Sequence, residues 1–265
     1  MDFNFKKKFG QNFLTDKNLL DSIVDLSGAN KDSVVLEIGP GAGALTSAIA
    51  KKVNKVVSFE IDRELEPVLA ENLKEFNNSE IVFKDFMKTS DEEIIKSVGN
   101  DYQVIANLPY YITTPILFRF FESKVHPKSL TIMVQKEYGE RMVAKKNTSE
   151  YSSLSVLCAW LGEAKIVKNV SRKMFTPPPK VDSCIVHFEF NGEKYDENFA
   201  AFIRTCFQMR RKTLVNNLSH GLNIGKEEIS RVLNSCKIDI NARAETLDFE
   251  EIKNLYDCIK MNSNC

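Results

Sequence analysis

The tetrapeptide Asn107-Leu108-Pro109-Tyr110 has the chemistry to hold a nucleobase by its exocyclic amine. An Asn side-chain oxygen and a neighbouring backbone carbonyl can both accept hydrogen bonds from such an amine, while the Tyr ring offers a face for stacking. Two acceptors that pull the amine toward tetrahedral geometry would free a lone pair that is otherwise delocalised into the base. The same residues also suit an ordinary turn after a strand, so the tetrapeptide alone leaves both interpretations open.

A glycine-rich segment, residues 37–43, follows one predicted strand and opens a predicted helix. Its glycines Gly39 and Gly41 permit a tight turn and let the backbone approach a ligand closely. The acid Glu37 precedes the first glycine, and Pro40 lacks one of the amides that would hold a pyrophosphate. Both details favour S-adenosylmethionine, which carries a sulfonium and an amino-acid tail, over a dinucleotide.

Two acids stand at the ends of the next two predicted strands. Glu60 is placed to accept from both hydroxyls of a ribose, and Asp85 could accept from an adenine amine. An acid at the second strand end also occurs in NAD enzymes, and either acid could instead cap a helix or a turn. Only the combination of Gly39, Glu60, Asp85 and Asn107, at the ends of four successive strands, makes the cofactor pocket the favoured interpretation.

A parallel sheet is needed to bring these strand ends together. Segments typical of strands are residues 34–38, 55–60, 81–84, 102–106 and 130–134, and residues 184–190 suit a closing strand. Between them lie segments with helical patterns, residues 44–52, 64–76 and 115–121. Strands spaced by helices in this way predict an α/β fold with a doubly wound, parallel sheet.

The last part of the chain has a different pattern. From about Tyr195 the apolar residues recur at helical spacing, and residues 227–236 and 249–261 predict two further helices. We therefore expect a cofactor-binding domain over residues 1–192, with a basic N-terminal segment at residues 1–16. A small all-α domain is expected over residues 193–265.

Composition narrows the class of protein. No apolar run is long enough to cross a bilayer, and the N-terminus lacks the apolar stretch of a secretory signal. The six cysteines and three histidines lack metal-ligand spacing, so we expect no metal site and reduced thiols in a cytoplasmic protein. The formal net charge is zero, but basic residues cluster at Lys6-Lys7-Lys8, between residues 119 and 146, and at Arg210-Arg211-Lys212. Such clusters modestly favour a phosphate-contacting surface over a solvated face.

Several motifs together resemble the KsgA-type dimethyladenosine transferases. They are residues 8–16, 37–43, 107–110, 133–137, 175–183 and 211–214, in order over nearly the whole chain. The resemblance implies a Rossmann-like class I methyltransferase with a mostly parallel seven-stranded sheet and a small all-α C-terminal domain that positions rRNA. It implies S-adenosylmethionine as cofactor and dimethylation of N6 of two adjacent adenosines, in the hairpin loop near the 3′ end of 16S rRNA. The implied partner is 16S rRNA in the 30S subunit or its precursor, with a role in small-subunit biogenesis and a monomeric enzyme.

The resemblance also implies roles for individual residues. The cofactor-binding set is Asn12, Leu14, Gly39, Gly41, Glu60, Ile61, Asp85, Phe86 and Asn107, with Asn12 and Leu14 closing over the cofactor. The catalytic set is Asn107, Leu108, Pro109, Tyr110 and Phe175, with the target adenine inserted between the two rings and its amine held by Asn107 and the Leu108 carbonyl. The RNA-binding set is Lys6, Lys7, Lys8, Arg210, Arg211 and Lys212. Phe175 could instead be a core aromatic at a sheet edge.

Three alternatives stay open beside this function. A 23S rRNA adenine methyltransferase of the macrolide-resistance type is expected to carry Ile at the position of Leu108. A non-catalytic RNA-binding assembly factor would not need the full set of cofactor residues, and Pro40 disfavours a nicotinamide dehydrogenase. The chain departs from the family pattern at Phe9 and Ala42, where Leu is common, and at Tyr111, where many members have Asn.

Overall fold

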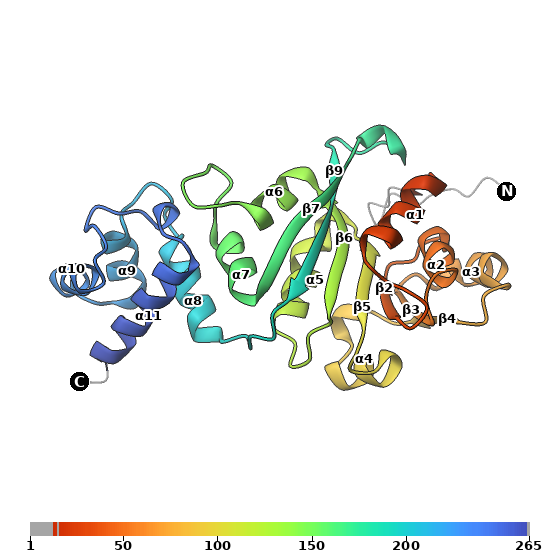
Figure 1. Cartoon of the computed structure of the whole chain (residues 1–265), viewed down its shortest axis with the longest axis horizontal. Helices are drawn as coiled ribbons and strands as arrows, with labels where there is room; N and C mark the ends of the chain where they lie inside the picture. Colours follow the sequence, from red (N-terminus) through yellow and green to blue (C-terminus); the bar gives the residue numbers. More distant parts are fainter. Residues whose placement is uncertain (1–12, 15, 264–265) are drawn as a thin grey trace. The chain divides into compact units, whose positions relative to one another are not determined.

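The structure is a computed structural model that describes residues 13, 14 and 16–263 (Figure 1). The described residues form two compact units. The first contains the residues up to Gly139 together with Glu163–Gly192, and the second contains Glu140–Gly162 and the residues from Glu193 onward. Residues 140–162 were expected in the first domain, whereas the structure groups them with the C-terminal helices.

A seven-stranded sheet forms the first unit, in the order β4-β3-β2-β5-β6-β9-β7. The strands are β2 (Val34–Ile38), β3 (Lys55–Glu60), β4 (Ser79–Phe83), β5 (Gln103–Asn107), β6 (Ser129–Gln135), β7 (Gly162–Val170) and β9 (Ser183–Phe190). The pairs β2–β3, β3–β4, β2–β5 and β5–β6 are parallel, and β9 is antiparallel to β6. The expected mostly parallel seven-stranded sheet is therefore confirmed.

The strand order reverses at β2, and this reversal positions the site. From β2 the chain moves outward through β3 to β4, and then returns to the other side of β2 as β5 and β6. Ligands of open α/β sheets bind at the carboxyl ends of the strands beside such a reversal. The carboxyl ends of β2, β3 and β5 carry the glycine-rich turn, Glu60 and Asn107.

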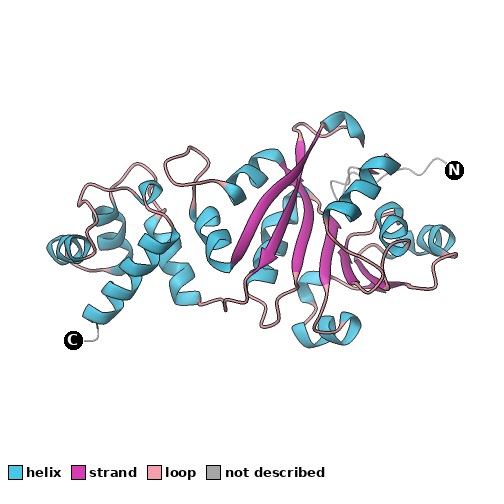
Figure 2. Cartoon of the chain, viewed as in Figure 1, coloured by secondary structure: helices cyan, strands magenta, loops and turns pink. Residues whose placement is uncertain are grey.

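Apolar side chains bury the central strands on both faces. Figure 2 shows the strands as one twisted layer with helices around it, and six of the seven residues of β6 are buried. Continuous burial of this kind is typical of parallel strands covered by helices on both faces. The core contains the fully buried Ile23, Ile49 and Ile105, which come from two helices and one central strand.

The helices of the first unit differ in part from the prediction. They are α1 (Lys17–Leu26), α2 (Ala44–Ala50), α3 (Glu66–Leu73), α4 (Asp91–Val98), α5 (Thr113–Phe121) and α6 (Lys136–Val143), the last crossing into the second unit. The predicted helix at residues 64–76 is shorter because its start, Arg63–Leu65, is a 3-10 turn capped by Asp62. The helix α4 was not predicted, although Ser90 and Glu93 form a capping box at its start.

The second unit is helical, as expected for the C-terminal part of the chain. Its helices are α7 (Ser153–Leu161), α8 (Glu197–Cys206), α9 (Leu214–Leu222), α10 (Lys226–Ser235) and α11 (Phe249–Ser263). The rings of Trp160 and Phe199 meet edge to face at 4.8 Å, which joins α7 to α8. Among the residues that the structure describes, no helix is both long and apolar enough to span a bilayer.

Candidate active site

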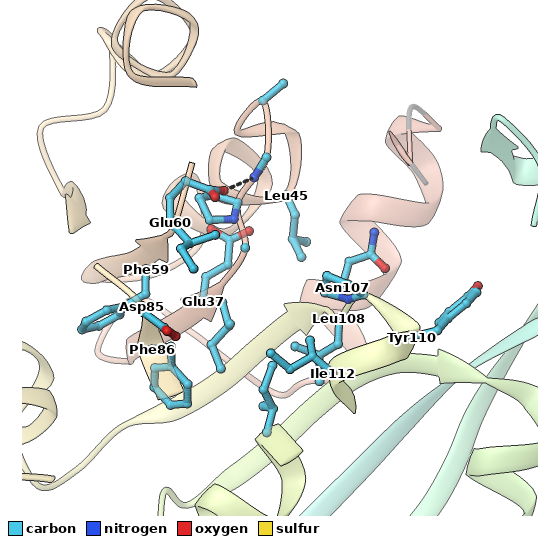
Figure 3. Close-up of a pocket in the computed structure, with 18 of the residues that line it drawn as sticks. Glu37, Leu45, Phe59, Glu60, Asp85, Phe86, Asn107, Leu108, Tyr110 and Ile112 are labelled. Carbon is cyan, nitrogen blue, oxygen red and sulfur yellow. Dashed lines mark hydrogen bonds between the residues drawn. The ribbon is translucent and has the colours of Figure 1, made fainter. Parts of the chain in front are cut away.

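A pocket opens at the carboxyl ends of β2 to β5 (Figure 3). Eleven of the residues that sequence analysis singled out contribute to its wall: Gly39, Gly41, Glu60, Ile61, Asp85, Phe86, Asn107, Leu108, Pro109, Tyr110 and Phe175. All of them belong to the first unit. All the members of the cofactor-binding and catalytic sets whose side chains the structure describes therefore share one cavity.

The glycine-rich turn has a backbone shape that other residues disfavour. Gly39, Gly41 and Gly43 have φ angles of +70°, +57° and +84°, in the left-handed region where a Cβ atom is crowded. The amide of Gly39 donates to the carbonyl of Phe59 across 2.9 Å, which ties the end of β2 to β3. A Cβ atom at Gly43 would lie 3.2 Å from Cδ2 of Leu69 on α3. The turn is thus held close to the sheet and to α3, while Gly39 and Gly41 line the pocket.

Glu60 anchors this turn while it lines the pocket. Its Oε2 atom accepts from the Gly41 amide at 3.3 Å, drawn in Figure 3, and its Oε1 atom accepts from the Asp62 amide at 2.8 Å. Burial raises the pKa of this carboxyl, and the backbone hydrogen bonds oppose that rise. Each carboxylate oxygen has a further lone pair, so Glu60 can still accept hydrogen bonds from a ribose.

A second acid, Glu37, lies deeper under the turn. It is only 1% exposed, and its Oε2 atom accepts from the hydroxyls of Thr46 and Ser58, both at 2.6 Å. Burial raises the pKa of Glu37 to about 7, while the two hydroxyl donors lower it. The position of this acid before Gly39 favoured one cofactor class, but its hydroxyl partners were not predicted; they come from α2 and β3.

Asp85 and Phe86 form the wall beyond β4. The Oδ1 atom of Asp85 accepts from the Met87 amide at 3.0 Å, so the acid caps a 3-10 turn as the alternative interpretation held. It also faces the pocket, and its side chain is 28% exposed. The ring of Phe86 packs 5.7 Å from that of Phe59 and 5.4 Å from that of Phe120. The turn therefore presents a carboxylate beside a fixed apolar surface.

Asn107 is the last residue of β5 and is half-buried. Within the described part of the chain, its side-chain amide makes no hydrogen bond, although it lines the pocket. The loop that follows is fixed, because the Pro109 carbonyl accepts from the Ile112 amide at 3.1 Å and from the Thr113 hydroxyl at 3.2 Å. The end of β5, followed by this fixed loop, thus holds an amide with unused donors and acceptors at the cavity wall.

Tyr110 extends to the side of Asn107 that is away from Glu60 and Asp85 in the view of Figure 3. Its Oη atom and the Oγ atom of Ser183 share a hydrogen bond of 2.6 Å. Burial raises the pKa of the Tyr110 phenol. The ring is half-buried, and one end of it is fixed to strand β9.

Phe175 is both a pocket residue and a core residue. It is 3% exposed and packs in the cluster that contains Met133 and Ile185. It belongs to the short strand β8 (Phe175–Thr176), which pairs with β1 (Phe13–Leu14) so that Leu14 lies opposite Phe175. The core interpretation of this ring therefore has support, and the ring also contributes to the pocket wall.

The remaining predicted residues include some that the structure does not describe. Asn12 and Lys6, Lys7 and Lys8 are outside the described residues, and only the backbone of Leu14 is described. Arg210, Arg211 and Lys212 are exposed between α8 and α9 of the second unit. Arg210 is already engaged, because its guanidinium donates to the Ser149 carbonyl and lies 3.5 Å from Glu245. The exposed side chains of Arg211 and Lys212 are therefore more accessible to a ligand than that of Arg210.

Other pocket residues were not predicted. They include Leu20, Leu45, Lys84, Met87, Tyr111 and Ile112. Tyr111 is 64% exposed at the pocket and follows the tetrapeptide directly, so its place beside the motif was the available signal. Leu20 comes from α1, and only the packing of that helix brings it to the pocket. Among the described residues, no group of three or more His, Cys, Asp or Glu side chains could hold a metal ion.

Comparison with protein families gives a match to one family over nearly the whole chain. The model of the family described as ribosomal RNA adenine dimethylase matches residues 2–261. The chain is 44% identical over 268 residues to ribosomal RNA small subunit methyltransferase A of Bacillus mycoides (strain KBAB4), covering 97% of this chain and 92% of the relative. It is 43% identical over 271 residues to the protein of that name from Bacillus cereus (strain B4264), covering 98% and 93%.

Solved structures give a similar result. A dimethyladenosine transferase from Plasmodium falciparum superposes with a TM-score of 0.79 at 28% identity, covering 95% of this chain and 98% of that one. The 23S rRNA methyltransferase ErmE superposes with a TM-score of 0.72 at 26% identity, covering 94% and 100%. Both likenesses extend over the two units, including the C-terminal helices.

Proposed function

The chain belongs to the ribosomal RNA adenine dimethylase family, and we propose that it dimethylates N6 of two adjacent adenosines in 16S rRNA. The target pair lies in the hairpin loop near the 3′ end of that RNA, within the 30S subunit or its precursor, and the modification contributes to small-subunit biogenesis. The enzyme acts as a monomer in the cytoplasm. Identities of 44% and 43% to two small-subunit methyltransferases, over 97% and 98% of this chain, support this choice of substrate.

The cofactor proposed for the pocket is S-adenosylmethionine, which supplies a methyl group activated by a sulfonium. The residues present fit it, because Glu60 can accept from ribose hydroxyls and Asp85 from an adenine amine. A Cβ atom at Gly39 would meet no neighbouring atom within 4 Å, so the turn leaves room for a close backbone approach. Pro40 lines the same turn without an amide to offer a phosphate, so the cradle suits a cofactor without phosphates.

In the proposed reaction, Asn107 holds the amine of the target adenine. Its side-chain oxygen and the Leu108 carbonyl would each accept one N6 hydrogen and turn the nitrogen lone pair toward the cofactor side of the pocket. Once the nitrogen has taken the methyl group it is positively charged, and its proton is acidic enough to pass to water, so these residues need only hold the amine and no strong base is required. The rings of Tyr110 and Phe175 would stack on the two faces of the extruded adenine.

One observation carries this proposal above the rest. The amide of Asn107 lies in the wall of the pocket that Glu60 and Asp85 also line, with no hydrogen bond inside the described part of the chain. Its donors and acceptor are therefore available to a ligand that enters this pocket. This observation also argues against an assembly factor that has lost its chemistry.

Transfer of radiolabelled methyl groups to purified ribosomal subunits tests the proposal. Unmethylated 30S subunits should accept two methyl groups on each of the two adenosines, and mass mapping of the RNA should place them in the 3′ hairpin loop. The likeness to ErmE makes 23S rRNA the second candidate substrate. Methylation of 23S rRNA with 30S subunits left unmodified would establish that alternative instead.

The exposed Arg211 and Lys212 are proposed to contact phosphates of the rRNA, together with Arg210. Residues 193–265 would then position the RNA, while residues 1–192 hold the cofactor and the target base. Lys6, Lys7 and Lys8 are proposed to add to the same electrostatic attraction, and Asn12 and Leu14 to close over the cofactor.

A further inference from the structure

Resting on the proposed function, we propose that Ser183 is a positioning residue that fixes the base-stacking ring of Tyr110. The two residues are 73 positions apart in the chain, and their oxygens are 2.6 Å apart. This separation is typical of a well-formed hydrogen bond between hydroxyl groups. Ser183 would not touch the substrate, and it would act through the orientation of the ring.

Ser183 is a rigid anchor. It is fully buried, begins strand β9, and lies opposite Gln135 of β6 in the antiparallel register. Tyr110, by contrast, begins a single 3-10 turn, Tyr110–Ile112, and its ring is half-buried. A tyrosine has two side-chain torsions, and a fixed partner for its hydroxyl restricts both of them. The strand therefore determines where the ring stands.

Asp182, the residue before Ser183, holds the segment that leads to Phe175. The Asp182 carboxylate accepts from the Arg172 amide at 2.9 Å, at the start of the 3-10 turn Arg172–Met174 that leads to Phe175. The carbonyl of Asp182 accepts from the Lys136 amide at 3.0 Å, which holds this point to the end of β6. Two consecutive residues thus fasten Tyr110 and the segment that carries Phe175.

The consequence is a defined spacing between the two proposed stacking rings. A base held between aromatic faces must also present its amine to Asn107, so a small rotation of one ring misdirects the nitrogen. The loss should appear in the rate of transfer, because cofactor contacts at Glu60 and RNA contacts in the second unit are unchanged.

The test compares Ser183→Ala, Tyr110→Phe and the double variant on unmethylated 30S subunits. Each single variant should lower kcat about five- to tenfold, the size expected for one net hydrogen bond. The KM for the subunit and the affinity for S-adenosylhomocysteine should each change by less than about twofold. The double variant should be no slower than either single one, because both remove the same bond.

Ser129→Ala is the matched control. Ser129 is also a buried serine at the start of a strand, and its hydroxyl accepts from Gln103 at 3.3 Å. The register of β6 with β9 places it at the opposite end of the sheet from Ser183. This variant should retain the kcat of the wild type, even if its thermal stability falls as far as that of Ser183→Ala.

Three results would overturn the inference. A wild-type kcat in Ser183→Ala, or additive losses in the double variant, would show that the bond does not position the ring. A faster Ser183→Ala enzyme would show that the bond restrains the ring from its working position. If the wild-type protein itself methylates no 30S subunits, the proposed function fails as well, which distinguishes the two failures.

Discussion

The amide of Gly41 donates to the Oε2 atom of Glu60 across 3.3 Å, so a carboxylate at the end of β3 holds the turn that follows β2. The two halves of the predicted cofactor site are therefore one hydrogen-bonded unit. Because Glu60 would both bind the cofactor and hold the neighbouring turn, replacing its carboxylate by an uncharged amide should weaken cofactor binding.

Glu60→Gln should weaken the binding of S-adenosylhomocysteine about tenfold or more, because charged acceptors form stronger hydrogen bonds than amides do. Isothermal titration calorimetry measures this change directly. Glu66→Gln, at an exposed position in the first turn of α3, is the control and should bind as the wild type does. An unaltered Kd in Glu60→Gln would exclude Glu60 from the cofactor site.

Stability should depend on pH through Glu37. Its pKa of about 7 in the folded protein exceeds the ordinary value of 4.5, so the folded state holds this proton more tightly than the unfolded chain does. The stabilising contribution is then present below pH 4.5 and is lost as pH rises toward 7. Glu37→Gln removes this loss, so the variant should gain about 2–3 kcal/mol relative to the wild type between pH 5 and 8. Urea unfolding of both proteins across this range gives the difference, and a difference that is constant with pH would contradict the assignment.

The glycine-rich turn offers a matched pair of substitutions. Gly43 and Gly28 both have positive φ angles, +84° and +70°, but only at Gly43 would a Cβ atom meet neighbours, with Leu69 at 3.2 Å. In both alanine variants the free energy of unfolding should fall by about 1–2 kcal/mol, because the left-handed backbone conformation crowds the new Cβ atom. Gly43→Ala should lose about 1 kcal/mol more from crowding and should also bind the cofactor more weakly. Equal losses in urea unfolding would show that the turn tolerates a side chain.

Neutralising Arg211 and Lys212 should change how salt affects RNA binding. If each contacts one phosphate, the double Gln variant should reduce the slope of log K against log salt by about 1.4–1.8. Filter binding of 30S subunits at several salt concentrations measures the slope. The pair Lys31→Gln and Lys96→Gln removes the same charge from exposed sites of the first unit and should leave it unchanged. An identical slope in both double variants would rule out the proposed phosphate contacts of Arg211 and Lys212.

Much of the sheet could be predicted because its strands are short apolar runs with clear ends. Predicted residues 34–38 and 55–60 coincide with β2 and β3, and the predicted segment 102–106 differs from β5 by one residue at each end. The polar residues that follow such runs gather at one sheet edge for geometric reasons alone. Site residues at strand ends are therefore accessible to sequence reasoning.

The features that were not predicted from the sequence depend on tertiary packing. The segment Ser153–Leu161 is apolar almost all round, so its periodicity does not tell which neighbour it packs against, and in the structure it belongs with the C-terminal helices. Apolar residues recur at helical spacing from about Tyr195 onward, but this spacing does not mark the turn at residues 207–213 that separates α8 from α9. The contact of Tyr110 with Ser183 joins two motifs that the sequence presents separately.

The most direct measurement for the whole account is methyl transfer by Asn107→Ala. Loss of this amide should lower kcat on 30S subunits on the order of a hundred- to a thousandfold, as for other groups that act on the reacting atoms. The affinity for S-adenosylhomocysteine should remain within about threefold of the wild type, because Glu60 and the glycine-rich turn are untouched. Asn77→Ala, at an exposed position, should transfer at the normal rate. Full activity in Asn107→Ala would contradict the central claim that this side chain presents the adenine amine for methylation.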